Sequence, residues 1–401
     1  MITNKLSDIY AKIVGLCDRF KRYPKPRIIF KAPAHSNILV YDSTNKEILI
    51  EILGNYDYHF FDVRGESVNL FCLLQSLFHR GTRKEAYIDI YIKHVNPKVV
   101  LTFIDNSISF YKIKSRHPLI HTVFLQNGLR SYYGDVFENL DKVPSAYLPL
   151  FQVDTMLVFG DFIGKKYNEY VSGNSISVGS PKNNIAPPLN GHIKDNTTIA
   201  LISQYCYEEV NISGRNYSPD EFFVKSDRFV INVLKDYLLS RNKRLIIVKR
   251  YPCENSKSML EDDYFKSMFD ERLDFVHPTS PFTSYQATDS AYVSVTIDST
   301  LGYESLARGN RAVFFSVRSH FTGLHGYEFA WPGSFPESGF CWSNIPDKRV
   351  CFNCLDFAFT ASDTEWDNAI KKLDLKNIME YDPFNNKSQG LINSLVPADG
   401  F

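Results

Sequence analysis

The 401-residue sequence contains no apolar run near the roughly 18 residues that a membrane-spanning helix needs. Residues 1–27 also lack the apolar core and cleavage site of a secretory signal. Net charge is absent too, because 45 Lys and Arg balance 45 Asp and Glu, which removes the electrostatic argument for nucleic acid as a partner. We therefore expect a cytoplasmic protein that does not bind nucleic acid.

Metal-binding patterns are equally sparse. The seven cysteines are scattered, and only Cys351 and Cys354 form a Cys-x-x-Cys pair, which without a second pair or nearby histidines does not predict a zinc site. Asp-x-Asp, by which many sugar-transferring enzymes hold a divalent metal on a diphosphate, is missing. We expect no bound metal, so that Lys, Arg and helix dipoles would have to neutralise any bound phosphate.

The motifs of four common enzyme classes are absent as well. The sequence has no Walker A lysine motif, no Gly-x-Gly-x-x-Gly, no Gly-x-Ser-x-Gly and no His-Glu-x-x-His. These absences argue against an NTPase, a dehydrogenase, a serine hydrolase and a zinc protease.

What is present is an alternation of short β-rich apolar runs with helix-length segments, which predicts parallel sheets with crossover helices. The expected strands of the first half lie at residues 27–30, 37–42, 47–53, 58–63, 97–105, 120–128 and 154–162. Those of the second half lie at residues 197–204, 243–252, 273–278 and both ends of 291–316. Residues 177–197 are rich in Pro, Gly and Asn and are typical of a connector. The sequence predicts an α/β fold of two Rossmann-like domains, residues 1–185 and 195–401.

The most informative segment is residues 291–316, whose pattern is strand, tight turn, helix, strand. Ligands of open α/β sheets bind outside the carboxyl ends of strands, where a helix N-terminus attracts an anion. Ser299 and Thr300 at this turn can cap the helix and offer hydroxyls to a phosphate, and Glu304 can accept from ribose hydroxyls. An ordinary helix cap is the alternative interpretation of this turn.

Two further strand exits carry basic residues directly before proline. Lys249 and Arg250 precede Tyr251-Pro252, and His277 precedes Pro278. Because the residue before proline is held extended, such side chains project from the sheet edge, where they can meet an anionic ligand. Taken alone, His277 is more typical of a surface or cap histidine.

Polar residues also follow strands in the first half: Asp105, Gln126 and Asn127. Amides at such positions either bind sugar hydroxyls or hold a backbone turn. Arg130 is a candidate partner for a sugar carboxylate. Ser180 and Lys182 either reach a bound ligand or belong to a linker turn.

Together these segments resemble the bacterial retaining β-Kdo transferases, GT-B enzymes that move Kdo from CMP-β-Kdo during O-antigen or capsule synthesis. The resemblance spans nearly the whole chain and is carried by residues 102–111, 124–128, 178–182, 246–252, 275–278 and 297–309. It implies an N-terminal acceptor domain, a C-terminal CMP-sugar domain and a cleft between them.

The resemblance also implies roles for the candidate residues. The donor would be bound by Ser299, Thr300, Lys249, Arg250, Glu304, Ser180 and Lys182. The substrate would be bound by Gln126, Asn127 and Arg130. Two residues would take part in catalysis, His277 and Asp105. Retention implies a carboxylate nucleophile and a covalent intermediate. The matching position is Asn232, so either Asp236 or Glu221 serves instead, or the chain has lost its nucleophile.

Two alternatives remain beside this transferase: another GT-B phosphosugar transferase, or a catalytically inactive carbohydrate-binding domain. The resemblance implies an oligosaccharide or lipid-linked glycan acceptor and a place within a longer multi-domain transferase. The basic segment at residues 18–27 either contacts the cytoplasmic face of the inner membrane or forms a solvated helix end.

Overall fold

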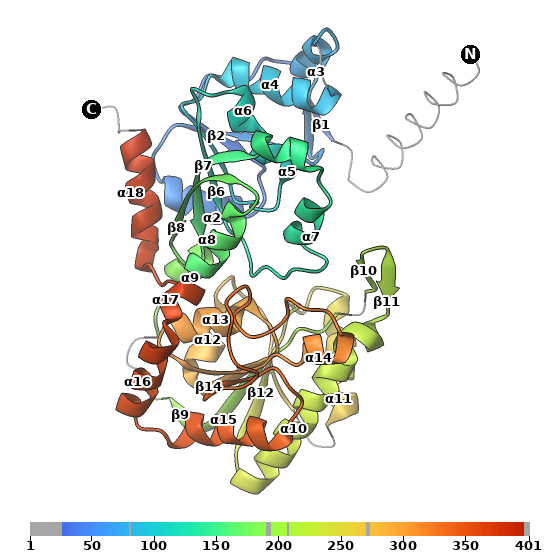
Figure 1. Ribbon diagram of the computed structural model, residues 1–401, viewed down its shortest axis with the longest axis vertical. Helices are drawn as coiled ribbons and strands as arrows, with labels where there is room; N and C mark the ends of the chain where they lie inside the picture. The colour runs from blue at the N-terminus through green and yellow to red at the C-terminus, as the bar shows by residue number, and fades with distance from the viewer. Residues whose placement is uncertain (1–25, 80–81, 190–193, 207, 270–272, 397–401) are drawn as a thin grey trace, which may run out of the picture. The chain divides into compact units, whose positions relative to one another are not determined.

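A computed structural model describes residues 26–79, 82–189, 194–206, 208–269 and 273–396 (Figure 1). The chain divides into two compact units: residues 1–125, 150–155 and 388–401 form the first, and residues 126–149 and 156–387 form the second. Most of the basic segment at residues 18–27 lies outside the described residues. No described helix is long and apolar enough to cross a membrane.

Unit 1 is built on short parallel strands. Its strands are β1 (Arg27–Ile29), β2 (Ile38–Tyr41), β3 (Tyr58–Phe61), β4 (Ser67–Asn69), β5 (Val99–Thr102) and β6 (His121–Leu125). Its helices include α2 (Lys46–Leu53), α3 (Leu70–Ser76), α4 (Arg83–Val95), α5 (Ile108–Tyr111), α6 (Ile113–Arg116) and most of α18 (Asn386–Leu395). Strands β3, β2, β5 and β6 pair in parallel, while β1 pairs with β4. All four residues of β2 and of β5 are buried, as expected for parallel strands covered on both faces.

One predicted element is wrong. Residues 47–53 were expected to form a strand, but they lie in helix α2. Leu49, Ile52 and Leu53 are its buried residues, and their spacing of three and four matches one face of a helix. The apolar run Glu-Ile-Leu-Ile-Glu-Ile-Leu fits both periods over so few residues, so the pattern did not separate them.

Unit 2 contains a second six-stranded sheet. Its strands are β9 (Asp195–Ile202), β12 (Arg244–Val248), β13 (Asp274–Val276), β14 (Ala291–Thr296), β15 (Arg311–Phe315) and β16 (Trp342–Ser343), in the order β13-β12-β9-β14-β15-β16. Its neighbouring strands pair in parallel. The chain adds strands to one side of β9 and then to the other, so a topological switch point lies between β9 and β14.

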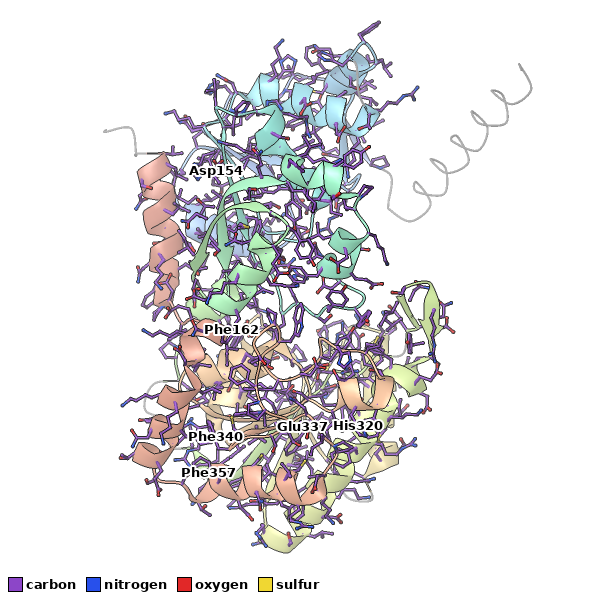
Figure 2. The ribbon with its side chains drawn as sticks, viewed as in Figure 1. Asp154, Phe162, His320, Glu337, Phe340 and Phe357 are labelled. Atoms are coloured by element: carbon purple, nitrogen blue, oxygen red, sulfur yellow. The ribbon has the colours of Figure 1, made fainter. Side chains whose placement is uncertain are left out.

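Helices cover both faces of this sheet (Figure 1). Helices α12 (Thr283–Ser290) and α13 (Thr300–Ala307) lie on one face, and α10 (Lys225–Arg241) and α15 (Lys348–Thr360) lie on the other. Phe357 of α15 meets the ring of Phe340 edge to face at 5.6 Å, and both pack near Trp366 (Figure 2). These ring contacts hold α15 and Trp366 against the segment that precedes β16.

The remaining elements of unit 2 are short. They comprise α7 (Val136–Asp141), α8 (Asp161–Asn168), β8 (Ser172–Ser177), α9 (Pro181–Ile185), the hairpin β10 (Val210–Ile212) and β11 (Arg215–Tyr217), α11 (Lys257–Met268), α14 (Arg318–Thr322), α16 (Asp363–Leu373) and α17 (Leu375–Ile378). Strand β7 (Gln152–Val158) stands between β6 and β8 in the order of the first sheet, β3-β2-β5-β6-β7-β8. The division into functional domains at residues 185 and 195 stays a prediction.

Candidate functional site

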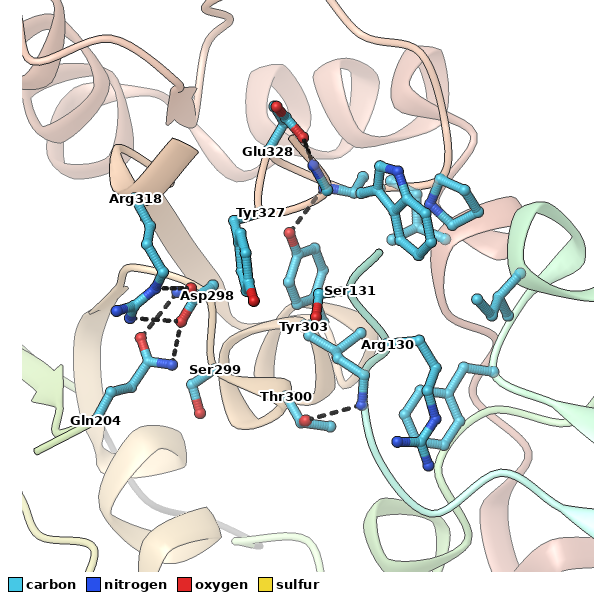
Figure 3. A pocket seen from close by; sticks show the side chains of 18 of the residues that line it. Arg130, Ser131, Gln204, Asp298, Ser299, Thr300, Tyr303, Arg318, Tyr327 and Glu328 are labelled. Atoms are coloured by element: carbon cyan, nitrogen blue, oxygen red, sulfur yellow. Dashed lines mark hydrogen bonds and ion pairs between the residues drawn. The ribbon is translucent and has the colours of Figure 1, made fainter. Parts of the chain in front are cut away.

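A pocket of about 400 Å³ opens within unit 2 at the switch point of its sheet (Figure 3). Ser203 and Gln204 follow β9, and Asp298 and Ser299 follow β14, so the carboxyl ends of both strands supply lining residues. This is where open α/β sheets bind their ligands.

The start of helix α13 forms one wall of the pocket. Ser299 is its N-cap, and its hydroxyl accepts from the Leu301 amide at 3.3 Å. Thr300 follows, and its hydroxyl accepts from the Leu129 amide at 3.2 Å. A helix N-terminus carries partial positive charge and unpaired N–H groups, so this wall favours an anion.

A buried ion pair stands beside that helix. The Arg318 guanidinium, 1% exposed, donates to both carboxylate oxygens of Asp298, at 3.1 Å for Nη2–Oδ1, and to the Phe222 carbonyl at 2.8 Å. Gln204 accepts from the Asp298 amide at 2.9 Å and donates to its carboxylate. Burial disfavours the charge of Arg318, but Asp298 outweighs it and holds the pKa of Arg318 above its usual value. The loop that carries Asp298 is thus held by Arg318 and by Gln204 (Figure 3).

Near this pair lies a buried acid, Asp227 of α10. Its carboxylate accepts from the Tyr264 hydroxyl at 2.6 Å. Burial raises the pKa of Asp227 to about 6, although nearby Arg318 and the Tyr264 bond oppose the shift. Asp227 does not line the main pocket but borders a small void that Gln204 shares.

Two arginines bring further positive charge to the pocket. Arg250 follows β12 and keeps an exposed side chain, whose Nη1 lies 3.4 Å from the Tyr205 carbonyl. Arg130 is held by Asp135, at 3.3 Å, and by the Asn127 side chain. With the start of α13, these side chains make the pocket suitable for an anionic group.

Aromatic rings also line the pocket. The Tyr303 hydroxyl accepts from the Ala330 amide at 2.8 Å, and the Tyr327 hydroxyl donates to the Tyr133 carbonyl at 2.7 Å. Trp331 lines both this pocket and an adjoining hollow of about 470 Å³, which Tyr132 and Lys165 also border. Ring faces next to polar groups suit sugars and bases.

Five residues that the sequence singled out line this pocket: Gln126, Arg130, Arg250, Ser299 and Thr300. Gln126 is 1% exposed, and its side-chain amide bonds to the backbone. It accepts from Phe159 N at 2.8 Å and donates to Gly128 O at 2.9 Å. Its side chain therefore fixes a turn, which was one of the two interpretations of its sequence position.

Three other candidates form a separate cluster. The Ser180 hydroxyl donates to Glu304, which also accepts from the Tyr285 hydroxyl at 3.0 Å, and the Lys182 amine lies 5.7 Å from the Tyr285 ring centre. Burial raises the pKa of Glu304, while the two hydroxyl donors lower it. None of these three residues is among the described lining residues of the pocket.

The remaining candidates lie elsewhere. Lys249 is buried and donates to Ser258 O at 2.9 Å, and His277 has a buried Nδ1 without a hydrogen-bond partner among the described residues. Asn232 is exposed on α10. Asp105 is wholly buried in unit 1, where its carbonyl accepts from the Tyr111 hydroxyl. Asn127 contacts Arg130 without lining the pocket.

Sequence reasoning missed the residues that hold the site together. Arg318, Gln204 and Tyr327 follow strands or helices without a basic-Pro or Ser/Thr pattern, and nothing in the sequence pairs Arg318 with Asp298. Of the residues in these contacts, only Asp298 could have been found from the sequence, because it begins the Asp-Ser-Thr turn.

Comparisons with solved structures place this fold among known ones. The UDP-GlcNAc 2-epimerase of Methanocaldococcus jannaschii, solved with UDP-GlcNAc and UDP, is 10% identical with a TM-score of 0.51, over 89% of this chain and 99% of that one. A glycosyltransferase of Rickettsia africae is 9% identical with a TM-score of 0.50, over 91% and 100%. These likenesses confirm the predicted α/β, GT-B-like fold. A search of curated proteins finds no match.

Residues 123–396 match a family model described as "putative O-antigen biosynthesis protein". The match covers well over half of the chain and includes all the pocket-lining residues named above. The chain belongs to this family of O-antigen biosynthesis proteins.

Proposed function

We propose that this protein is a glycosyltransferase that moves a sugar from a nucleotide-activated donor to a glycan acceptor during O-antigen synthesis. The observation that carries the proposal is the start of α13 at the switch point, where Ser299 and Thr300 line a pocket with Arg130 and Arg250. An anionic leaving group would be held by the helix N-terminus and by one or both arginines.

The donor we propose is CMP-β-Kdo. The sequence resemblance points to it, and the charge of the pocket is compatible with it: a nucleoside monophosphate and a sugar carboxylate are both anions that arginine binds. The single phosphate needs less positive charge than a diphosphate, so we expect no metal requirement. Stabilising the departing CMP is the catalytic contribution these residues would make.

Retention of configuration would need a carboxylate near the anomeric carbon. Among the described lining residues the carboxylates are Asp298 and Glu328. Asp298 is fixed by Arg318, and Glu328 accepts from the Gly326 amide at 2.6 Å. Asn232 is exposed and not part of this wall, and Asp236 and Glu221 are paired with Lys348 and Ser218 instead. We therefore assign the nucleophile to Asp298 or Glu328.

The decisive experiment is transfer from CMP-β-Kdo, generated in situ, to a panel of synthetic acceptors, with and without EDTA. We expect transfer that EDTA does not abolish and that falls by at least about 100-fold in the variant that lacks the nucleophile, Asp298→Asn or Glu328→Gln. Asn232→Asp is the matched control and should leave the rate near wild type. A large gain in Asn232→Asp would instead restore position 232 as the nucleophile.

Nucleotide binding distinguishes this transferase from the two alternatives, another GT-B transferase and an inactive carbohydrate-binding domain. The M. jannaschii epimerase was solved with UDP-GlcNAc and UDP, so UDP and UMP are included beside CMP in a calorimetric titration. Preference for a uridine nucleotide would replace the Kdo donor by another nucleotide sugar. Absence of binding by all three would favour the inactive carbohydrate-binding domain.

A further inference from the structure

Unit 1 exposes an apolar face on α3 and β1. Phe78, just after α3, is 90% exposed, Phe30, just after β1, is 71% exposed, and Leu74 and Leu77 are each more than half exposed. The residues of this apolar face are Ile28, Phe30, Leu73, Leu74, Leu77 and Phe78. Scattered single apolar side chains are ordinary on a protein surface, but a contiguous group marks an interaction site.

The geometry explains why these residues face outward together. Helix α3 buries Cys72 and Ser76, which lie four residues apart on one side, and leaves Leu73 and Leu77, also four apart, on another. Ile28 and Phe30 are two residues apart and so share one side of an extended chain. Helix α3 packs against β1, so the two elements that carry these residues are neighbours (Figure 1).

Basic residues lie on the elements that adjoin this face. Arg27 and Lys31 flank the β1 residues, and Arg83 and Lys84 begin α4, which packs against α3. All four side chains are exposed, as is that of one acid, Glu66, whose carbonyl accepts from Arg27 N at 3.0 Å. Apolar side chains within a basic rim match a bilayer whose headgroups are anionic.

We propose that the apolar face docks this protein onto the surface of an anionic lipid bilayer. Leu77 and Phe78 would enter the boundary between headgroups and acyl chains, while the flanking arginines and lysines contact lipid phosphates. The face belongs to unit 1, whereas every described lining residue of the donor pocket belongs to unit 2. Lipid binding and nucleotide binding can therefore be tested independently, because a variant can lose one without losing the other.

The test is co-sedimentation of the full chain with vesicles of phosphatidylcholine alone or mixed with phosphatidylglycerol. We expect binding to the mixed vesicles that weakens as salt rises. Leu77→Glu combined with Phe78→Glu should lower the partition coefficient by at least about tenfold, because two apolar side chains no longer enter the membrane. Lys31→Glu with Arg83→Glu should weaken binding and flatten its salt dependence.

Leu119→Glu is the matched control, since Leu119 is 99% exposed in unit 1 but outside the apolar face. It should bind vesicles like wild type, and all variants should keep the thermal midpoint of the wild type. Wild type without affinity for the mixed vesicles would overturn the proposal, as would equal binding by the Leu77/Phe78 variant. A lipid-independent change of oligomeric state or a loss of stability in that variant, with vesicle binding intact, would assign the face to a second copy or to another part of this chain.

Discussion

Among single residues, Asp227 couples the stability of unit 2 to pH. Burial raises its pKa from 3.8 to about 6, so the folded protein holds a proton there that the unfolded chain has already lost. Its contribution is greatest below pH 4 and disappears as the pH rises through 6. Asp227→Asn can still accept from Tyr264, and we expect it to stabilise the protein at pH 7.5 by on the order of 3 kcal/mol at most.

The measurement is thermal unfolding of wild type and Asp227→Asn between pH 4 and pH 7.5. The two curves should converge at the acid end, diverge between pH 4 and pH 6 and stay apart above pH 6. A constant difference across the range would contradict the shifted pKa. Asp356→Asn is a useful comparison, because the hydrogen bond from Arg241 lowers the pKa of Asp356 and gives the opposite sign.

Removing the carboxylate of Asp298 should be far more costly than removing a surface acid. Asp298→Ala leaves Arg318 charged, buried and unpaired on that side, which typically costs about 3–5 kcal/mol. Asp289→Ala is the matched control, because Asp289 makes a similar buried pair with Arg308 but does not line the pocket. Urea unfolding should show comparable losses, while CMP binding should fall only in Asp298→Ala. Equal loss of CMP binding in both would show that the effect on the site is indirect.

Two neighbouring residues, Lys249 and Arg250, show which side-chain positions the sequence could predict and which it could not. Lys249 and Arg250 looked equivalent before Pro252, yet Arg250 lines the pocket and Lys249 turns inward to Ser258 and Asp262. Successive side chains of an extended chain point to opposite sides, so only one of two adjacent basic residues can face a ligand there. Which one does so depends on helix α11, whose packing the sequence does not state.

At the scale of elements, helix α13 lies unusually close to strand β14 at Gly302. A Cβ on Gly302 would overlap the Thr296 methyl and lie 3.1 Å from the Phe314 ring. We expect Gly302→Ala to cost about 1–3 kcal/mol and to displace the start of α13. Thr296→Ser removes the methyl but keeps the hydroxyl that accepts from Ser299 N at 3.0 Å.

A double-mutant cycle in urea therefore tests this packing. The Gly302→Ala/Thr296→Ser pair should be more stable than the sum of the single changes implies, because the overlap is relieved. Strict additivity would mean that the helix shifts without contacting Thr296.

The cap of α13 separates stability from ligand binding. Ser299 and Ser362 both cap helices with their hydroxyls, but Ser362 lies at α16, away from the pocket. Replacing either serine by alanine should cost about 1 kcal/mol of stability. Only Ser299→Ala should also weaken CMP binding, which calorimetry measures. Unchanged affinity in Ser299→Ala would limit Ser299 to a structural cap.

Elements were easier to predict than residue contacts wherever the pattern was long. Strands β5, β9 and β14 are largely buried, rich in β-branched and apolar residues, and lie where the sequence predicted strands. The prediction of a strand at residues 47–53 was wrong, because a short run of Ile and Leu with two Glu fits a strand and a helix equally well. Before α10 the Ser218 hydroxyl accepts from Glu221 N at 3.3 Å, and the turn that follows, Asp220–Val224, is a π-helix.

For the whole molecule, strand order could not be derived from the sequence, although the positions of most strands in the two six-stranded sheets could. Alternating strands and helices predicted parallel sheets, but only the structure shows that β9 sits between β12 and β14. That order brings Gln204 and Asp298, 94 residues apart, into hydrogen-bond contact on the wall of the pocket. The site depends on this long-range pairing, which is why the sequence indicated five lining residues but not the contacts that hold them together.

Because the described lining residues of the pocket all belong to unit 2, nucleotide binding should leave a footprint confined to that unit. We expect saturating CMP to slow amide exchange in residues 129–131, 298–303 and 326–332, since a ligand stabilises only the conformations that bind it. At a concentration of 100 Kd the binding free energy adds about 2.7 kcal/mol, enough to slow exchange by roughly 100-fold where opening releases the ligand. Hydrogen exchange read by mass spectrometry measures this, with UMP as the control nucleotide. Protection concentrated in residues 26–125 would place the nucleotide in unit 1 and contradict the assignment of the donor to the start of α13.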